Sequence, residues 1–228
     1  MSSTEHDARS TSERFSAVLR SATTVDHEAA AVSNYMSDLF EGRLSRDEYA
    51  EMVAQHYFAY VVLEEAAEAM RGDAIAGAFV IDALTRVPAL RADLEYLYGA
   101  DWESSVVPSA STIAYCERMR EVCFTLPEAF VAHHYTRYMG DLSGGQMIGR
   151  IVRKSYDLAP GSGAAFYEFD GIEDIPAFKA HYRELLDQAA FDDEAARRMT
   201  DEVAEAYRLN TVVLAELDSD VSAARAAS

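Results

Sequence analysis

Residues 140–145 read Gly140-Asp141-Leu142-Ser143-Gly144-Gly145, and this short stretch decides how the chain is interpreted. It lies inside residues 128–156, whose apolar pattern otherwise predicts one long amphipathic helix. Each glycine inside a helix costs about 1 kcal/mol relative to alanine, so three of them weaken this helix by roughly 3 kcal/mol. Glycine is placed where a side chain would keep another backbone or a ligand from approaching closely. The sequence therefore predicts that something lies flat against this helix.

Composition restricts the class of protein. The chain has 228 residues, 50% of them apolar and 26% charged, which fits one globular domain. No apolar run approaches the roughly 20 residues that cross a bilayer, and the first residues, MSSTEHDARSTSERF, lack the regions of a secretory signal. We therefore expect a soluble, cytoplasmic protein with no membrane anchor. Lys and Arg total 20 against 39 Asp and Glu, and this net charge of −19 argues against binding nucleic acid.

Helical periodicity recurs along the chain, and neither a strand pattern nor an internal repeat is evident. The expected helices cover residues 10–24, a second segment up to 42, then 45–70, 74–99, 109–124, 128–156, 176–190 and 192–217. Ser45 and Glu48 have the spacing of a capping box at the start of one of them. We predict one all-α domain over residues 11–217, with disordered ends at residues 1–10 and 218–228.

The two cysteines, Cys116 and Cys123, are seven residues apart within a helical pattern. Two turns of helix separate them by about 10 Å, which is too far for a disulfide. We expect both to be reduced core residues. No CxxCH motif occurs, which excludes covalent attachment of a c-type haem.

The six histidines suggest a bound metal, but most metal sites lack their ligands here. A di-iron carboxylate bundle needs Glu-x-x-His on two helices, and the sequence has no such motif. It has no HExxH zinc motif either. A single axial histidine on a haem iron requires only one residue.

His27 is the best candidate for that ligand, because the small residues that follow Glu28 leave room for a flat molecule. Arg20 lies seven residues earlier on the same helix face, about 10 Å along the axis, which suits a carboxylate at the edge of the macrocycle. Taken alone, such a pair is more often a partly exposed surface histidine, here His27, and a solvated charge, here Arg20. The glycines alone would likewise fit helix-on-helix packing. The two features together favour haem.

Residues 131–146 read VAHHYTRYMGDLSGGQ, and this stretch resembles the distal helix of the heme oxygenases, specifically the soluble bacterial type, almost residue for residue. The resemblance extends from about Phe15 to Leu217. It implies a single-domain, multi-helix heme oxygenase-like fold in which haem is sandwiched between a proximal helix and the Gly-rich distal helix.

The resemblance also implies roles around the iron. His27 would be the proximal ligand, and Gly140 and Gly144 would press their backbone onto the distal haem face. The residues beside them would be Ser143 and Gly145. Asp141 would hold a water that hydrogen-bonds the iron-bound dioxygen. The resemblance implies that this water network continues through Tyr60, Arg137 and Asn210.

At the haem edge, the resemblance implies that the propionate-binding positions are Arg20, Tyr135, Lys179 and Arg183. Lys179 and Arg183 are four residues apart on one helix face, so both can reach one anion, although a solvated basic stripe would have the same spacing. Tyr207 stands where the family often has a haem-contacting phenylalanine. His133 and His134 match structural positions. The chain departs from the family at Ala31, where a carboxylate often supports the proximal histidine.

The implied reaction opens haem b (iron protoporphyrin IX), which is both cofactor and substrate, to biliverdin, carbon monoxide and ferrous iron. It consumes O2 and electrons from an external donor, either a ferredoxin-type protein or a flavin or NAD(P)H reductase. Arg150, Arg153 and Lys154 form a basic cluster that could receive an acidic donor, or that simply complements a helix dipole. The propionate-binding positions resemble those that give the α isomer, and a role in iron acquisition or in pigment synthesis is left open.

Two other functions are also compatible with parts of the sequence. A haem carrier or sensor would share His27 and the glycine wall but would not need Asp141. An unrelated helical enzyme, such as a thiamin-degrading type, would need a nucleophilic cysteine, and neither cysteine has an evident activating partner in the sequence.

Overall fold

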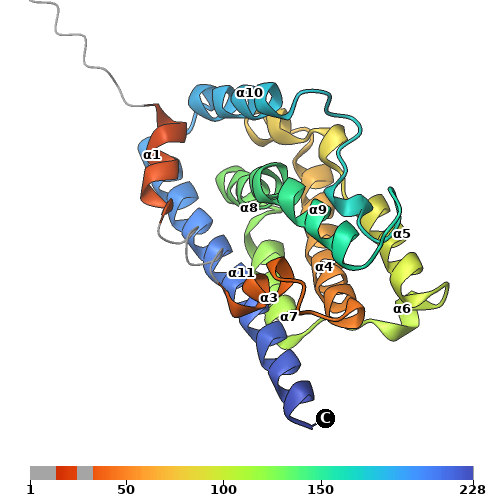
Figure 1. Ribbon diagram of the computed structural model, residues 1–228. Helices are drawn as coiled ribbons and strands as arrows, with labels where there is room; N and C mark the ends of the chain where they lie inside the picture. Colours follow the sequence, from red (N-terminus) through yellow and green to blue (C-terminus); the bar gives the residue numbers. More distant parts are fainter. Residues whose placement is uncertain (1–13, 25–32, 228) are drawn as a thin grey trace, which may run out of the picture.

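The computed structural model describes residues 14–24 and 33–227, and these residues form helices joined by short connections (Figure 1). The longer helices are α1 (Phe15–Ala22), α3 (Asn34–Phe40), α4 (Arg46–Met70), α5 (Val87–Tyr98), α7 (Ala110–Val122), α8 (Pro127–Gly140), α9 (Gln146–Ser155), α10 (Ile175–Gln188) and α11 (Asp193–Ala227). The shorter ones are η1 (Ala76–Phe79), η2 (Asp82–Leu84), α6 (Trp102–Ser105), the π-helical turn η3 (Asp141–Gly145) and η4 (Ala165–Tyr167). The predicted all-α fold is confirmed.

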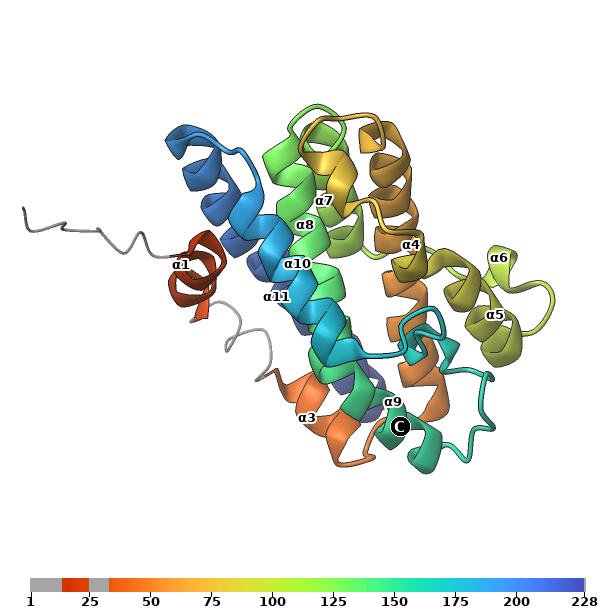
Figure 2. The same ribbon diagram turned by 90° about the horizontal axis from the view of Figure 1, so that it is seen from above.

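The core lies among the long helices α4, α7, α8 and α11. Helix α8 packs chiefly against α11, and α4 packs chiefly against α5 and α7. Figures 1 and 2 both show α8 running through the middle of the molecule. Fully buried aromatic side chains fill this core, and each stabilises the fold by about 1.5–3 kcal/mol relative to an exposed position. They include Tyr35, Tyr49, Tyr60, Tyr115, Phe130 and Tyr182.

Helix α4 begins where the sequence predicts. The Ser45 hydroxyl accepts a hydrogen bond from the Glu48 backbone N–H at 3.2 Å, and the Glu48 carboxylate accepts one from the Ser45 N–H at 2.5 Å. This is the expected capping box, which satisfies two amide groups that the first turn leaves without partners.

The helix predicted over residues 74–99 is wrong. The structure has two 3₁₀ turns, η1 and η2, and the regular helix α5 begins only at Val87. Asp73 explains the first turn, because its carboxylate accepts hydrogen bonds from the N–H groups of Ile75 and Ala76, each at 2.8 Å. Pro88 explains the late start, because a proline ring fits the first turn of a helix and not its interior.

The helix predicted over residues 128–156 is interrupted. Helix α8 ends at Gly140, the π turn η3 occupies Asp141–Gly145, and α9 continues to Ser155. A π turn widens the helix by one residue per turn, and such turns occur frequently at functional sites. The stretch Gly140–Gly145 is therefore the point at which the helix changes its register.

The C-terminal end also differs from the sequence prediction, since α11 continues through the segment 218–227. Val221 is buried, and Arg225 pairs with the Asp38 carboxylate at 2.8 Å and donates to the Arg43 carbonyl at 3.0 Å. These contacts join residues far apart in the chain, so local composition does not reveal them. The predicted disorder of residues 1–10 lies outside the described residues.

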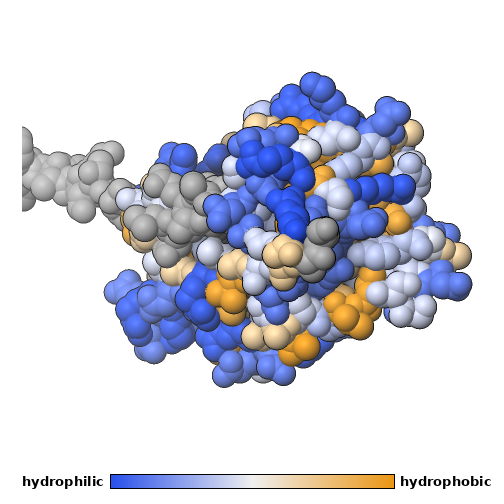
Figure 3. All heavy atoms as spheres, turned by 60° about the horizontal axis from the view of Figure 1, so that its bottom comes forward, coloured by the Kyte–Doolittle hydropathy of each residue, from blue (hydrophilic) through white to orange (hydrophobic). Residues whose placement is uncertain are grey.

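Both cysteines are buried and free, as predicted. None of the helices within residues 14–24 and 33–227 is long and apolar enough to cross a membrane. On the face shown in Figure 3, hydrophilic side chains predominate and apolar ones are scattered among them.

Candidate functional site

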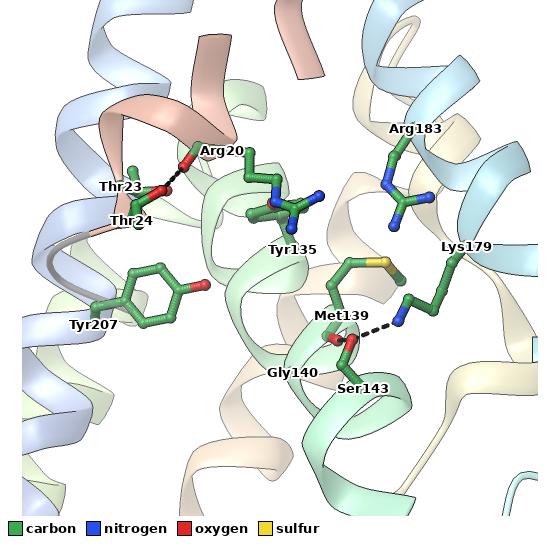
Figure 4. Close-up of a pocket in the computed structure, with 10 residues that line it drawn as sticks. All are labelled: Arg20, Thr23, Thr24, Tyr135, Met139, Gly140, Ser143, Lys179, Arg183 and Tyr207. Atoms are coloured by element: carbon green, nitrogen blue, oxygen red, sulfur yellow. Dashed lines mark hydrogen bonds between the residues drawn. The ribbon is translucent and has the colours of Figure 1, made fainter. Parts of the chain in front are cut away.

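A pocket of about 570 Å³ opens between α1, α8, α10 and α11 (Figure 4). Its size falls within the range of small-molecule sites, roughly 300–1,000 Å³. The pocket is lined by Arg20, Thr23, Thr24, Tyr135, Met139, Gly140, Ser143, Lys179, Arg183 and Tyr207. The structure therefore brings together seven of the residues that the sequence assigned to haem, although they come from five separate elements.

Three cations extend into this pocket from two sides. Figure 4 shows Arg20 reaching in from α1, while Lys179 and Arg183 reach in from α10. Lys179 donates a hydrogen bond to the Ser143 hydroxyl at 2.6 Å, and Ser143 donates to the Met139 carbonyl, also at 2.6 Å. Partial burial and the charges of the two arginines lower the pKa of Lys179. The three like charges repel one another, so the pocket favours an anionic ligand between them.

The glycines divide into two groups. A Cβ atom added at Gly140 or Gly144 would meet no other atom within 4 Å, so both positions face open space. At Gly145 the same atom would lie 3.3 Å from a ring carbon of Tyr167, and Gly145 is buried. Gly140 lines the pocket, whereas Gly145 provides room for Tyr167 of η4.

Asp141 lies directly after Gly140, at the start of the π turn. Its carboxylate accepts a hydrogen bond from the hydroxyl of Tyr60, which is fully buried on α4. Burial raises the pKa of Asp141 to about 6, while the Tyr60 hydrogen bond and the charges of Arg137 and Arg86 oppose this rise. The carboxyl is therefore ionised at neutral pH but titrates close to it.

Arg137 is buried one turn before Asp141. The carbon at the centre of its guanidinium lies 5.6 Å from the centre of the Tyr60 ring and 4.9 Å from that of the Tyr115 ring. Asn210 does not line the large pocket. It lines a separate, small cavity beside Arg137, together with Tyr115 and His56. Tyr60, Asp141 and Arg137 thus form one cluster, and Asn210 lies next to it.

The histidines of the distal helix have structural partners, as predicted. His133 Nε2 lies 2.9 Å from a carboxylate oxygen of Glu202, and His134 Nδ1 lies 2.8 Å from the hydroxyl of Tyr182. Both rings are buried. The predicted proximal ligand His27 and the departure at Ala31 lie outside the described residues.

The pocket fits haem on its own features. Gly140 and Gly144 leave space against the distal helix for a flat ring, and Met139 and Tyr207 supply apolar surface. Arg20, Lys179 and Arg183 bring three positive charges to the same pocket, which suits a ligand with two carboxylates such as haem. We therefore take haem as the ligand that the described residues suit.

Comparison with known proteins agrees with this fit. Residues 13–216 match the family model described as heme oxygenase. The chain is 37% identical over 203 residues to heme oxygenase 1 of Nostoc sp., which covers 89% of this chain and 85% of that protein. It is 35% identical over 202 residues to the heme oxygenase of Rhodella violacea, covering 89% of this chain and 86% of the relative.

A solved structure of the same kind superposes on the whole fold. The crystal structure of heme oxygenase-1 from the cyanobacterium Synechocystis sp. in complex with heme matches with a TM-score of 0.88 and 34% identity, covering 94% of this chain and 96% of that one. The fold and the pocket define a helical protein whose pocket, between its helices, suits an anionic ligand. The chain belongs to the heme oxygenase family, whose members are oxidoreductases that degrade heme. The resemblance seen in residues 131–146 is confirmed.

Some residues that line the pocket were not predicted from the sequence. Met139 lies midway between Tyr135 and Ser143, and four-residue spacing puts all three on one helix face. Thr24 follows Arg20 by the same interval, so periodicity offered a signal for both missed residues. Tyr115 and His56 offered no such signal, because they reach the small cavity from other helices.

Proposed function

We propose that this chain cleaves haem oxidatively to biliverdin, carbon monoxide and ferrous iron, and that haem binds in the pocket between α1, α8, α10 and α11. The observation that carries the proposal is the cluster of Asp141, Tyr60 and Arg137 directly behind the pocket wall at Gly140. Bound haem supplies the iron at which O2 is activated and is itself the ring that is opened. The remaining steps are tasks for the side chains and the backbone of this chain.

The first task is to orient the ligand. Arg20, Lys179 and Arg183 hold the two carboxylates at one edge of haem, with the Tyr135 side chain beside them. Lys179 exchanges its hydrogen bond to Ser143 for one to a carboxylate, or shares its three donors between the two. Which edge carbon faces the distal turn depends on this anchoring, and the α isomer is the product that we expect.

The second task is to bring the distal helix close to the ring. Gly140 and Gly144 have no Cβ atom, so the backbone of this helix can approach the ligand face without a side chain between them. This closeness also leaves little room for bulk water above the ring.

The third task is to hold a proton at a defined place. The Asp141 carboxylate accepts one hydrogen bond from Tyr60 and has lone pairs left for a water molecule. A water held in this way lies between the carboxylate and the ligand, so it can deliver a proton without a strong acid touching the ligand. Arg137 stabilises the ionised form of Asp141, and Asn210 extends the polar surroundings toward α11.

Several parts of the proposal rest on the family resemblance. His27 serves as the proximal iron ligand, and electrons arrive from an external ferredoxin-type protein or reductase. The basic cluster on α9 is a weak candidate for the docking site, since Arg153 pairs with Glu168 at 2.9 Å and Arg150 donates to the Gln146 carbonyl at 3.2 Å. These contacts favour a structural role for both arginines. The cytoplasmic location stays a prediction.

The test separates an oxygenase from a haem carrier, which would use the same pocket without needing Asp141. The haem complex is incubated with ascorbate and O2, and the pigment is identified by chromatography. We expect the Soret band to disappear while biliverdin forms. A Soret band that persists, with no biliverdin, would contradict the proposal and favour the carrier.

A further inference from the structure

Helix α1 carries Arg20 into the haem pocket, but its own sequence caps it poorly. The helix has eight residues, whereas an isolated helix shorter than about 12–15 residues is only marginally stable in water. Its N-cap residue, Arg14, makes no side-chain capping bond, and no acidic residue lies in its first turn. Contacts with the rest of the protein must therefore hold this helix in place.

The carboxylate of Asp187, on α10, supplies the missing cap. Its Oδ1 accepts a hydrogen bond from the Ser16 backbone N–H at 2.9 Å, across 171 residues of sequence. Ser16 is the second residue of α1, and the amide at this position is one that an N-cap side chain usually satisfies. A negative charge at a helix N-terminus also interacts favourably with the helix dipole. Because the cap comes from a different helix, it is also a tether between α1 and α10.

Apolar contacts accompany this hydrogen bond. The ring of Phe15, the first residue of α1, packs edge to face against that of Phe191, with 6.3 Å between the ring centres. Phe191 lies three residues beyond the end of α10, and Leu19 on the next turn of α1 is fully buried. The start of α1 is therefore fixed against the C-terminal end of α10.

The tether lies one helical turn from each of two pocket arginines. Arg20 follows Ser16 by four residues on α1. Arg183 precedes Asp187 by four residues on α10. Four residues rise about 6 Å along a helix, so each arginine is about that far along its axis from the tether. Figure 4 shows the two side chains entering the pocket from opposite sides. Burial raises the pKa of Tyr135, and the charges of both arginines oppose this rise, so both guanidinium groups lie near its hydroxyl.

We propose that Asp187 is a positioning residue for the ligand: by holding α1 against α10 it sets the separation of Arg20 and Arg183, and thereby the orientation of the haem that these arginines anchor. Asp187 does not line the pocket itself, so it acts through the arginine on α1. The inference rests on the proposed function, because it takes haem as the ligand of this pocket.

A tether and a simple charge predict opposite effects on binding. The carboxylate of Asp187 repels the carboxylates of haem, so its charge alone would weaken binding and its removal would strengthen it. A tether keeps α1 in the position that binds haem, and its removal lowers the fraction of the protein that is competent to bind. A loss of affinity on removal of Asp187 therefore reports the tether and not the charge.

The first experiment compares haem affinities by titration. Asp187→Ala should bind haem about fivefold more weakly, which is the size expected for loss of a helix cap. Asp187→Asn keeps an acceptor oxygen for the Ser16 N–H without the charge, so it should retain the wild-type affinity. Glu184→Gln removes a negative charge from an exposed position of the same helix and is the matched control, which should not bind more weakly. Unchanged or tighter binding by Asp187→Ala would overturn the proposal.

A double-mutant cycle identifies the residue through which Asp187 acts. If Asp187 serves to place Arg20, its removal should cost little once that arginine is replaced. Haem affinity is measured for Arg20→Gln, for Asp187→Ala and for the double variant. We expect the loss caused by Asp187→Ala to shrink to about twofold or less in the Arg20→Gln background. An undiminished loss in that background would show that Asp187 does not act through Arg20, and the proposal would fail.

A local cap separates the positioning role from a merely structural one. Arg14 has the extended backbone of an N-cap, with φ −63° and ψ 133°, so a serine there can cap α1 without any contact to α10. We expect the double variant Asp187→Ala/Arg14→Ser to recover the thermal stability that Asp187→Ala loses in the haem-free protein, but not the haem orientation. The orientation is read from the haem methyl resonances in NMR spectra of the ferric cyanide complex, with Arg14→Ser alone as the control. Recovery of the wild-type resonances as well would reduce Asp187 to a cap and refute the proposal.

Product analysis connects the tether to the chemistry. A haem that is less firmly oriented exposes more than one edge carbon to the distal turn, so Asp187→Ala should form a smaller share of the α isomer, and Asp187→Asn should restore it. Chromatography of the pigment measures this share. Haem resonances and an isomer distribution that both stay unchanged in Asp187→Ala would contradict the orienting role. A wild type that binds haem without forming biliverdin would refute only the proposed function, because affinity and haem NMR spectra test the tether without turnover.

Discussion

Two groups of polar side chains can be compared: the cations at the mouth of the haem pocket, and the polar residues behind the π turn. They differ in whether they already have partners within the protein. Arg20, Lys179 and Arg183 form no ion pair with any carboxylate of the described chain, and Arg20 and Arg183 are exposed. Tyr60, Asp141 and Arg137, in contrast, are already in contact with one another. The first region needs charge from a ligand, whereas the second is assembled before any ligand arrives. Binding and chemistry should therefore be separable by mutation.

The largest effect on activity is expected in the cluster of Tyr60, Asp141 and Arg137, which is assembled without a ligand. Asp141→Ala should leave haem bound but slow biliverdin formation by about 100-fold or more, as for loss of a proton-transfer group. Biliverdin is measured by absorbance and chromatography, and haem affinity by titration. Asp141→Asn is the control that keeps a partner for Tyr60 without the charge. If Asp141→Ala turned over at the wild-type rate, the separation of a region for chemistry from a region for binding would be contradicted.

Variants of the pocket cations should show the opposite result, with weaker haem binding and little change in turnover. Lys179→Gln combined with Arg183→Gln should weaken haem binding by roughly 10- to 30-fold, because each partly exposed pair contributes about 1 kcal/mol. Turnover of the bound fraction should change little. Added salt should weaken wild-type binding more than that of the variant. Arg197→Gln, an exposed arginine of α11 that pairs with Asp201, is the control and should bind haem normally.

A pH titration sharpens the contrast without mutation. Because the pKa of Asp141 is raised to about 6, its ionised form, which we propose holds the water, is present above that pH and is lost below it. Turnover should therefore fall roughly tenfold between pH 7 and pH 5. Haem affinity is measured at each pH to separate binding from chemistry. The Asp141→Asn variant should be slow at both values, and an equal fall in that variant would assign the pH dependence to another group.

The smallest effect concerns the glycines. Gly144→Ala adds a Cβ atom into open space, so it should stabilise the haem-free protein by about 0.5–1 kcal/mol while weakening haem binding. Thermal unfolding and haem titration measure the two effects. Gly149→Ala is the contrasting control, because its Cβ would lie 2.7 Å from the Cβ of Tyr167 and should destabilise the protein by about 1–3 kcal/mol. Destabilisation by Gly144→Ala would show that this position is packed, not open.

Sequence patterns predicted the features that depend on contacts between residues close together in the chain. The capping box at Ser45 and the all-helical fold follow from spacing and periodicity, which report on contacts within a few residues. The stretch 131–146 was informative because the glycines, Asp141 and the buried Arg137 are neighbours in sequence. Arg20 was also suggested by its spacing from His27, whereas Lys179 and Arg183 could be assigned to the same pocket only through the family resemblance, since α1 and α10 meet there through tertiary packing.

The features that the sequence did not predict depend on distant partners. Arg225 extends α11 by pairing with Asp38, which is 187 residues away. The break before α5 depends on the Asp73 turn as well as on Pro88, and the apolar pattern hides both. The small cavity around Arg137 gathers residues from four helices, and no spacing rule within one helix could reveal it.

In evolutionary terms, the π turn at Asp141–Gly145 amounts to a single extra codon. Each residue of a regular helix advances the chain by about 100°, so an inserted residue would rotate everything after it by that angle unless a widened turn takes it up. Deleting one residue of the turn would restore regular α-helical spacing between α8 and α9, with Gly149 still facing Tyr167, but would remove the widened turn at Asp141. A regular helix and a helix with this widened turn are therefore separated by three nucleotides, which is a short step for a lineage to take in either direction.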